Sequence, residues 1–197
     1  MRARGFTLGL VLLLFTAACK RDELPKLSTL PAFTLRDQNG AAVTREKLQG
    51  SVWVANFMFT SCPDVCPILT TKMASVRTRL VAERVPVRIV SFTVDPATDT
   101  PEVLKRYAQE RNADHADWSF LTGSIDDIKS VVVGGFKQAL GEKTEEQPGA
   151  PANILHGSHF VLIDRQGEIR GYYPSDNDGL LKLARDARIL ALAKEKG

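Results

Sequence analysis

Two cysteines lie close together in the stretch Phe59–Leu69, "FTSCPDVCPIL". Three residues separate Cys62 from Cys66, and a proline follows each cysteine. Paired thiols at this spacing can form a disulfide, exchange electrons with another disulfide, or hold a metal ion. A stabilising disulfide is the weakest of these interpretations, because a bridge that closes so small a loop removes little entropy from the unfolded chain.

The neighbouring residues predict where this pair lies. The apolar run Ser51–Phe59 precedes it and is typical of a strand buried on both faces, at the centre of a sheet. Proline is tolerated in the first turn of a helix, so Pro63 and Pro67 place the pair at a strand-to-helix junction, with Cys66 as the N-cap. Because the start of a helix lowers thiol pKa values, we expect thiolate character in one or both cysteines.

The spacing helps to separate redox chemistry from metal binding. Redox thioredoxins carry C-x-x-C, whereas this chain has one more intervening residue. Two soft thiolates with one imidazole suit copper in the +1 state, while structural zinc normally takes four protein ligands. The chain offers three histidines: His115, His156 and His159.

Each histidine also has an ordinary interpretation. His115 lies in a polar stretch and fits a solvated loop, while the other two lie at the entry to a strand, where histidines are commonly hydrogen-bonded. If that strand begins near Ser158, His156 lies in the preceding loop and is able to reach the cysteines. His159 then lies within the strand.

The remaining patterns predict a mixed α/β domain. The expected elements are a hairpin over 31–50 with its turn at Asn39-Gly40, helices over 67–84, 98–112, 124–136 and 178–194, and strands over 85–95, 118–123, 158–164 and 168–173, with 141–153 as loop. Thr100 and Ser124 are the expected N-caps of two helices. This order predicts a thioredoxin-like (peroxiredoxin-like) fold, with a mixed central sheet flanked by helices and an added N-terminal β-hairpin.

The N-terminus, "MRARGFTLGLVLLLFTAACK", predicts export. Its apolar run is too short to span a membrane and has the right length for a secretory signal. The small residues before Cys19 resemble the lipobox of bacterial lipoproteins, in which this cysteine becomes the acylated first residue, although Thr16 replaces the usual aliphatic residue. We therefore expect a cleaved signal over 1–18, a linker over 19–29 and a folded domain over 30–197. Ordinary cleavage that leaves Cys19 as a thiol is the alternative.

Composition supports one globular domain. The chain has 197 residues, of which 44% are hydrophobic and 25% charged, close to globular averages. Its formal charge of +3 falls to about +1 without the signal arginines, so nothing suggests a nucleic-acid partner. We expect an exported monomer, in the periplasm or on the outer face of a bacterial cytoplasmic membrane.

Four stretches together resemble the SCO/SenC family of thioredoxin-fold copper proteins. They are "FTSCPDVCP", "SFTVDPATDTPEVLKRYA", "WSFLTG" and "ILHGSHFVLIDRQGEIRGYY", and they stand in the family's order between Phe33 and Tyr173. The resemblance implies that Cys62, Cys66 and His156 are copper ligands. His159 falls where the family varies and is the runner-up.

One position departs from the family pattern. The residue before the ligand histidine is often aspartate in the family, whereas here it is Leu155. Asp95 or Asp99 could orient the imidazole instead. The ordinary interpretation of these two aspartates is a turn before the helix that Thr100 caps.

The resemblance implies a metallochaperone rather than an enzyme. It would carry copper, as Cu+ with Cu2+ as the other state, to the dinuclear copper centre of cytochrome c oxidase. Its partners would be the oxidase's copper-bearing subunit or another copper chaperone, and the membrane through the N-terminal lipid.

The main alternative is a thiol-disulfide oxidoreductase that reduces the acceptor's cysteines with the same pair, Cys62 and Cys66. Its activity would survive the loss of His156. A thiol peroxidase is disfavoured, because it needs one cysteine in a site built to attack peroxide. A purely structural module would show neither metal binding nor thiol reactivity.

Overall fold

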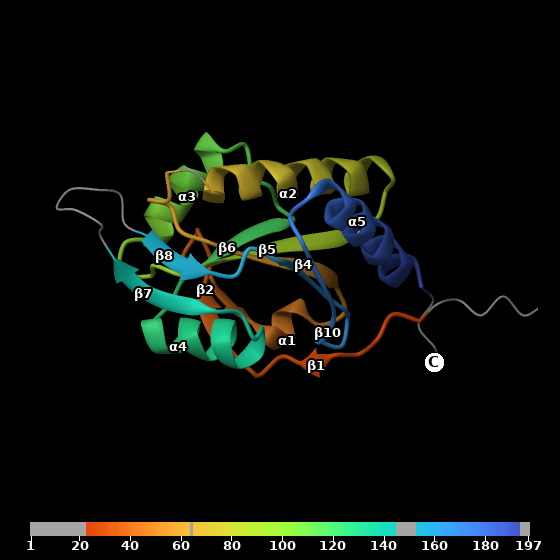
Figure 1. Cartoon of the computed structure of the whole chain (residues 1–197), viewed down its shortest axis with the longest axis horizontal. Coiled ribbons are helices and arrows are strands. Elements are labelled where there is room, and N and C mark those ends of the chain that lie inside the picture. The colour runs from red at the N-terminus through yellow and green to blue at the C-terminus, as the bar shows by residue number, and fades with distance from the viewer. Residues whose placement is uncertain (1–22, 64, 145–152, 194–197) are drawn as a thin grey trace, which may run out of the picture.

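A six-stranded mixed sheet forms the centre of the molecule (Figure 1). The computed structural model describes residues 23–63, 65–144 and 153–193. In sheet order the strands are β1 (Ser28–Thr29), β10 (Glu168–Tyr173), β9 (Phe160–Ile163), β4 (Val52–Met58), β5 (Val87–Thr93) and β6 (Trp118–Leu121). Strands β4, β5 and β6 run parallel, while β9 is antiparallel to both β4 and β10. All residues of β4 are buried, which confirms its predicted central place.

Helices cover both faces of the sheet (Figure 1). Their bounds are α1 (Arg45–Leu48), α2 (Val65–Ala82), α3 (Pro101–Glu110), α4 (Ile125–Lys129) with the π-helical turn η1 (Ser130–Gly135), and α5 (Asn177–Leu192). Figure 1 shows α2, α3 and α5 on one face, and α1 and α4 on the other. The predicted caps are confirmed, since the side chains of Thr100 and Ser124 accept hydrogen bonds from the amides of Val103 and Asp127.

Aromatic packing joins the sheet to η1. Phe136, at the end of this turn, packs against Phe57 and Phe92 with ring centroids 5.1 and 5.2 Å apart, and against Trp53 at 6.1 Å. All four rings are at most 1% exposed. Edge-to-face contacts of this kind add to the free energy gained from burial. The core therefore continues from the central strand to the helices below it.

The predicted N-terminal hairpin is confirmed. Strands β2 (Thr34–Arg36) and β3 (Ala42–Thr44) pair on either side of a turn that includes Asn39 and Gly40. Gly40 has a φ of +77°, a conformation that side chains other than glycine rarely adopt. After β3 the chain turns into α1, because the Thr44 hydroxyl accepts a hydrogen bond from the Lys47 amide and starts the helix.

The prediction that residues 141–153 form only a loop is wrong. Strand β7 (Leu140–Thr144) pairs antiparallel with β8 (Asn153–His156) to form a second two-stranded sheet. The sequence "GEKT" lacks the apolar alternation by which a half-buried strand is recognised, so its backbone pairing left no trace in the sequence. Residue 156 therefore ends a strand rather than lying in a loop.

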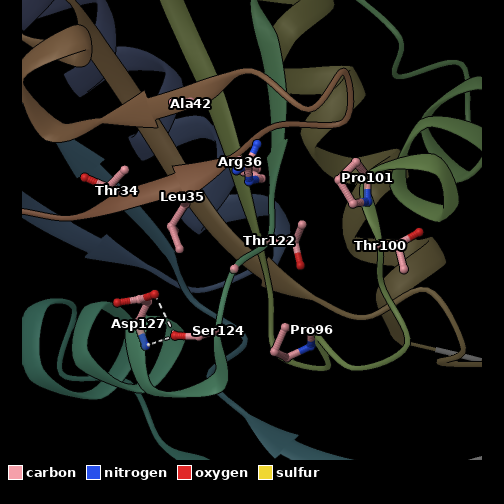
Figure 2. Close-up of a pocket in the computed structure, with 11 residues that line it drawn as sticks. Thr34, Leu35, Arg36, Ala42, Pro96, Thr100, Pro101, Thr122, Ser124 and Asp127 are labelled. Atoms are coloured by element: carbon pink, nitrogen blue, oxygen red, sulfur yellow. Dashed lines mark hydrogen bonds between the residues drawn. The ribbon is translucent and has the colours of Figure 1, made fainter.

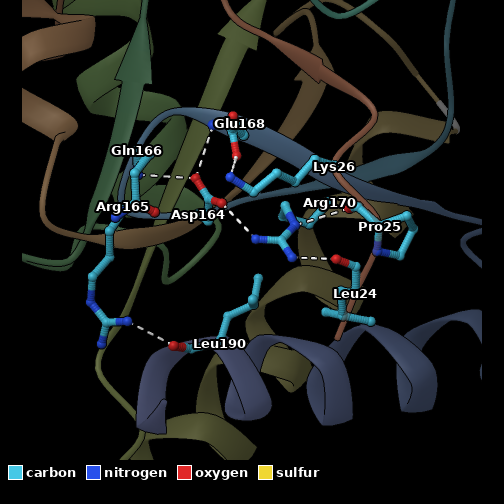
Figure 3. A network of polar contacts seen from close by, with 9 residues as sticks. All are labelled: Leu24, Pro25, Lys26, Asp164, Arg165, Gln166, Glu168, Arg170 and Leu190. Carbon is cyan, nitrogen blue, oxygen red and sulfur yellow. Dashed lines mark hydrogen bonds and ion pairs between the residues drawn. The ribbon is translucent and has the colours of Figure 1, made fainter. Parts of the chain in front are cut away.

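The segment before the hairpin is held against the domain (Figure 3). The Arg170 guanidinium, 7% exposed, donates to the carbonyl oxygens of Leu24 and Pro25 and pairs with Asp164 at 2.7 Å. Ser28–Thr29 then pairs with β10. Part of the predicted linker 19–29 thus packs on the sheet. The predicted signal, 1–18, and Cys19 lie outside the described residues, and within those residues no helix is both long and apolar enough to cross a membrane.

Because Tyr107 is buried, the free energy of unfolding should fall at alkaline pH. Its hydroxyl lies 2.9 Å from the Thr70 hydroxyl, and burial raises the pKa of Tyr107 to about 12. The neutral phenol therefore stabilises the fold fully below its unfolded pKa of about 10, and this contribution is lost as pH rises from there towards 12. Urea unfolding at pH 8 and pH 11.5 should show that the wild type loses about 2 kcal/mol more than Tyr107→Phe over this interval. Equal losses would contradict this.

Candidate metal centre

The cysteine pair lies where β4 passes into α2. Cys62 is half-buried in the connecting loop, and its amide donates to the Phe59 carbonyl at 3.3 Å. Cys66 is fully buried in the first turn of α2. The predicted strand-to-helix junction is therefore confirmed. The predicted N-cap role of Cys66 is wrong, because the helix begins one residue earlier, at Val65.

The two sulfurs are thiols that face the same helix start. The Cys66 amide donates a hydrogen bond to the Cys62 sulfur at 3.4 Å, and no disulfide joins the pair. The Cys62 sulfur therefore lies at the Cys66 amide, in the first turn of α2, and is partly open to solvent, while the Cys66 side chain is buried. This arrangement offers two soft donors to one ion that arrives from the surface.

Burial opposes thiolate formation at the inner cysteine. It raises the pKa of the Cys66 thiol well above its ordinary range. A hydrogen bond with the Phe59 backbone lowers this pKa, by less than burial raises it, and the nearby Cys62 thiol adds to the rise. The predicted thiolate character is therefore wrong for Cys66, because desolvation outweighs the effect of the helix start. A thiol in such a place gives up its proton when a metal ion replaces it.

A buried carboxyl group fixes the cysteine loop. Asp99 is fully buried and accepts hydrogen bonds from the Thr60 amide at 3.2 Å and from the hydroxyls of Thr60 and Thr93. Burial raises its pKa despite these bonds. Asp99 thus joins the residue two before Cys62 to the end of β5. It is a positioning residue for the loop.

The predicted turn at these aspartates is also present. The amides of Thr98 and Asp99 donate to the Asp95 carbonyl at 3.1 and 2.9 Å, just before the Thr100 cap. Thr60 and Thr93 were not predicted as part of the site. Their signal was topological: Thr93 ends β5 and Thr60 comes two residues after β4, and the carboxyl ends of adjacent parallel strands meet at the same edge of a sheet.

The three histidines are divided between two edges of the sheet, with His115 apart from the other two. His115 is half-buried in a turn before β6, where the Trp118 amide donates to its carbonyl at 2.9 Å. Since β6 runs parallel to β4, this turn lies at the amino ends of the parallel strands, away from the cysteines. Its interpretation as a loop residue is confirmed.

His156 and His159 lie at the edge that carries the cysteines. Both precede β9, which runs antiparallel to β4, so its start lies beside the carboxyl end of β4. His159 is exposed and comes just before the strand, not within it as expected. The backbone of His156 pairs with Leu140, but its imidazole lies outside the described part of the structure. Among the side chains that are described, no three His, Cys, Asp or Glu come together to hold a metal.

A separate cavity of about 500 Å³ lies below the hairpin (Figure 2). It is bordered by β2, the turn before α3 and the start of α4. Two of its polar side chains form the helix cap: Ser124 donates to the Asp127 carboxylate at 2.6 Å and accepts from its amide at 3.1 Å. Among the described side chains, no cysteine or histidine lines this cavity, so the candidate centre remains the pair at the end of β4.

Most of the chain is similar to one known protein family. The SCO1/SenC family model matches residues 21–190. The SCO1 protein homolog of Bacillus subtilis is 35% identical over 169 residues, which cover 84% of each chain.

Solved structures share the fold. A SCO1/SenC family lipoprotein from Bacillus anthracis has a TM-score of 0.75 and 35% identity, over 83% of this chain and 95% of that one. BsSco is a member of the Sco family of cytochrome c oxidase assembly proteins, and a disulfide switch was identified in it. It has a TM-score of 0.73 and 31% identity, over 87% of this chain and 99% of that one. Bradyrhizobium japonicum ScoI, solved with copper bound, has a TM-score of 0.71 and 26% identity, over 83% of this chain and 99% of that one. This chain, with its paired thiols at the end of the central strand, belongs to the SCO1/SenC family.

Proposed function

We propose that this protein binds copper outside the cytoplasm and delivers it to the dinuclear copper centre of cytochrome c oxidase during assembly. The observation that carries the proposal is the pair of adjacent thiols, Cys62 and Cys66, with the Cys66 amide 3.4 Å from the Cys62 sulfur. Copper-bound ScoI and the Sco family's place in oxidase assembly support it. Copper is the cargo rather than a resident cofactor.

The proposed ligands are Cys62, Cys66 and His156, with His159 as the runner-up for the third position. Two thiolates and an imidazole favour Cu+, and Cu2+ is the other state. Cys66 lies on the apolar interior and Cys62 at the surface, so the ion is shielded from water on one side and open on the other. Three ligands leave a position for an incoming thiolate of the acceptor, and transfer proceeds by ligand exchange.

The proposed location is the outer face of the cytoplasmic membrane or the periplasm, after cleavage of residues 1–18 and acylation of Cys19. The similar Bacillus anthracis protein is named a lipoprotein, which supports this anchor. Anchoring holds the donor near a membrane-bound acceptor. That acceptor is the copper-bearing subunit of the oxidase or another copper chaperone.

The second candidate is a thiol-disulfide oxidoreductase that reduces the acceptor's cysteines. The half-exposed Cys62 above the buried Cys66 favours it, because this is an arrangement of an attacking and a resolving thiol. The disulfide switch identified in BsSco points the same way. Both functions need the two cysteines, and only the chaperone needs the imidazole.

Oxidase activity in cells separates the two functions. A strain whose own gene for this protein has been deleted would receive the wild type, Cys66→Ser, His156→Ala or, as a matched control, His159→Ala. The chaperone predicts that Cys66→Ser and His156→Ala both lose oxidase activity and that His159→Ala keeps it. Full activity of His156→Ala, with loss in Cys66→Ser, would overturn the chaperone and favour the oxidoreductase.

A further inference from the structure

One face of α5 combines exposed aliphatic and basic side chains. Its members are Leu181, Lys182, Arg185, Arg188, Ile189 and Leu192. At 3.6 residues per turn these six lie within about a third of the helix circumference, while the opposite side is buried against the sheet. After Asp178 the only acidic residue of α5 is Asp186, which is 1% exposed, accepts a hydrogen bond from Tyr173 at 2.9 Å and pairs with Arg185 at 2.9 Å. This basic–aliphatic face therefore presents positive charge beside hydrocarbon.

The start of the described chain borders this face. A groove of about 490 Å³ lies between them, lined by Leu24, Arg185, Asp186, Arg188, Ile189, Leu192 and Ala193. Figure 3 shows Leu24 next to α5, where the buried Arg170 holds its carbonyl oxygen. Cys19 comes five residues before Leu24, a stretch of at most about 18 Å even when fully extended.

We propose that the basic–aliphatic face of α5 rests on the anionic surface of the membrane, an orientation that rests on the proposed lipid anchor at Cys19. An anchor on so short a stretch keeps Leu24, and α5 beside it, within reach of the lipid headgroups. Lys182 and Arg188 are then attracted to anionic headgroups. Leu181, Ile189 and Leu192 enter the boundary between headgroups and acyl chains, as the apolar residues of interfacial helices do.

This orientation determines which way the cysteine pair faces relative to the membrane. Arg188 lies 3.9 Å from Glu83, so the second half of α5 lies beside the chain that leaves the C-terminal end of α2. Cys66 is in the first turn of the same helix, and the distance from Cys66 to Ala82 is about 24 Å at 1.5 Å per residue. Figure 1 shows α2 running across the molecule to α5. The cysteines thus face away from the bilayer, towards an acceptor whose metal site stands well above the membrane.

Tryptophan quenching by brominated lipid tests the orientation. Leu192 and Ile68 are matched positions, because both are 54% exposed aliphatics. Ile68 lies near the start of α2, whereas Leu192 lies in the half of α5 that is beside the other end of α2. The mature chain carrying Leu192→Trp or Ile68→Trp would be added to vesicles of brominated phosphatidylcholine and phosphatidylglycerol. The native Trp53 and Trp118, 1% exposed, give the same background in both variants.

We expect quenching of the added tryptophan in Leu192→Trp and none in Ile68→Trp. Adding Lys182→Glu and Arg188→Glu to Leu192→Trp should return its fluorescence to the level of Ile68→Trp. The mass of the N-terminal peptide reports acylation of Cys19 separately. If Leu192→Trp were quenched although Cys19 carried no acyl chain, the result would support membrane contact by the basic–aliphatic face and refute the lipid anchor.

Equal quenching of the two variants, whether both are quenched or neither is, would overturn the proposal whatever the mass of the N-terminal peptide. Absence of quenching together with a dimer in light scattering would assign the basic–aliphatic face to a second copy of the chain instead.

Discussion

Replacing Cys66 with serine should lower the affinity for Cu+ by at least about 100-fold, if this residue is a ligand as proposed. A structural metal site of four ligands binds with about 10–16 kcal/mol, so one ligand is worth about 3 kcal/mol, and every 1.4 kcal/mol is a factor of ten. A serine hydroxyl is a hard donor and does not replace a soft thiolate. Competition with a Cu+ chelator under anaerobic conditions measures the change.

The buried position of Cys66 calls for a second variant. Cys66 is fully buried, so a hydroxyl there also affects folding, whereas Cys62 is half-buried and tolerates serine better. Cys62→Ser should therefore lose a similar share of the affinity with less loss of stability, and circular dichroism reports whether each variant is folded. If either folded variant bound Cu+ as tightly as the wild type, the two-thiolate site would be refuted.

Replacing Asp164 with asparagine lowers the free energy of unfolding by about 3 kcal/mol or more, because it leaves the Arg170 charge buried without a counter-ion. The side chains of the two residues are 5% and 7% exposed and pair at 2.7 Å. Asp164 also accepts the amides of Gln166 and Glu168 at 3.0 and 2.9 Å, and the asparagine oxygen can still accept both. The variant therefore removes the charge and keeps the turn. Urea denaturation at pH 7 measures the loss.

A pair in the same network provides the control. Lys26 meets Glu168 at 2.8 Å, but its side chain is 61% exposed. Exposed pairs contribute about 1 kcal/mol or less, so Lys26→Met should change stability far less than Asp164→Asn. Similar losses in the two variants would mean that burial of the Asp164–Arg170 pair is not what holds the N-terminal segment to β10.

The parts of the fold with local causes could be predicted from the sequence. The short, mostly apolar run of β4, rich in β-branched and aromatic residues, favours a buried strand. Thr100 with Pro101 specifies a helix start by capping and by a fixed backbone angle. The hairpin of β7 and β8 could not be predicted. Its backbone hydrogen bonds do not need apolar side chains, so the polar stretch from Gly141 left no periodic pattern.

In the candidate site, too, the features with local causes could be predicted and those that depend on the rest of the fold could not. The types and spacing of Cys62 and Cys66 indicated soft-metal or redox chemistry without any structure. The pKa of Cys66 could not be predicted, because burial depends on residues far along the chain and here outweighs the local effect of the helix start. The hydrogen bonds from Thr60 and Thr93 to Asp99 were missed for a similar reason, since the parallel pairing of β4 and β5 brings them together.

The most direct test of the copper site is an anaerobic Cu+ titration of the reduced domain that starts after Cys19, in competition with a chelator. The wild type should bind one equivalent tightly. His156→Ala should bind at least about 100-fold more weakly, as for the loss of any one ligand, while the matched control His159→Ala keeps wild-type affinity. Weak binding by the wild type, or unchanged affinity in His156→Ala, would contradict the site of two cysteines and His156.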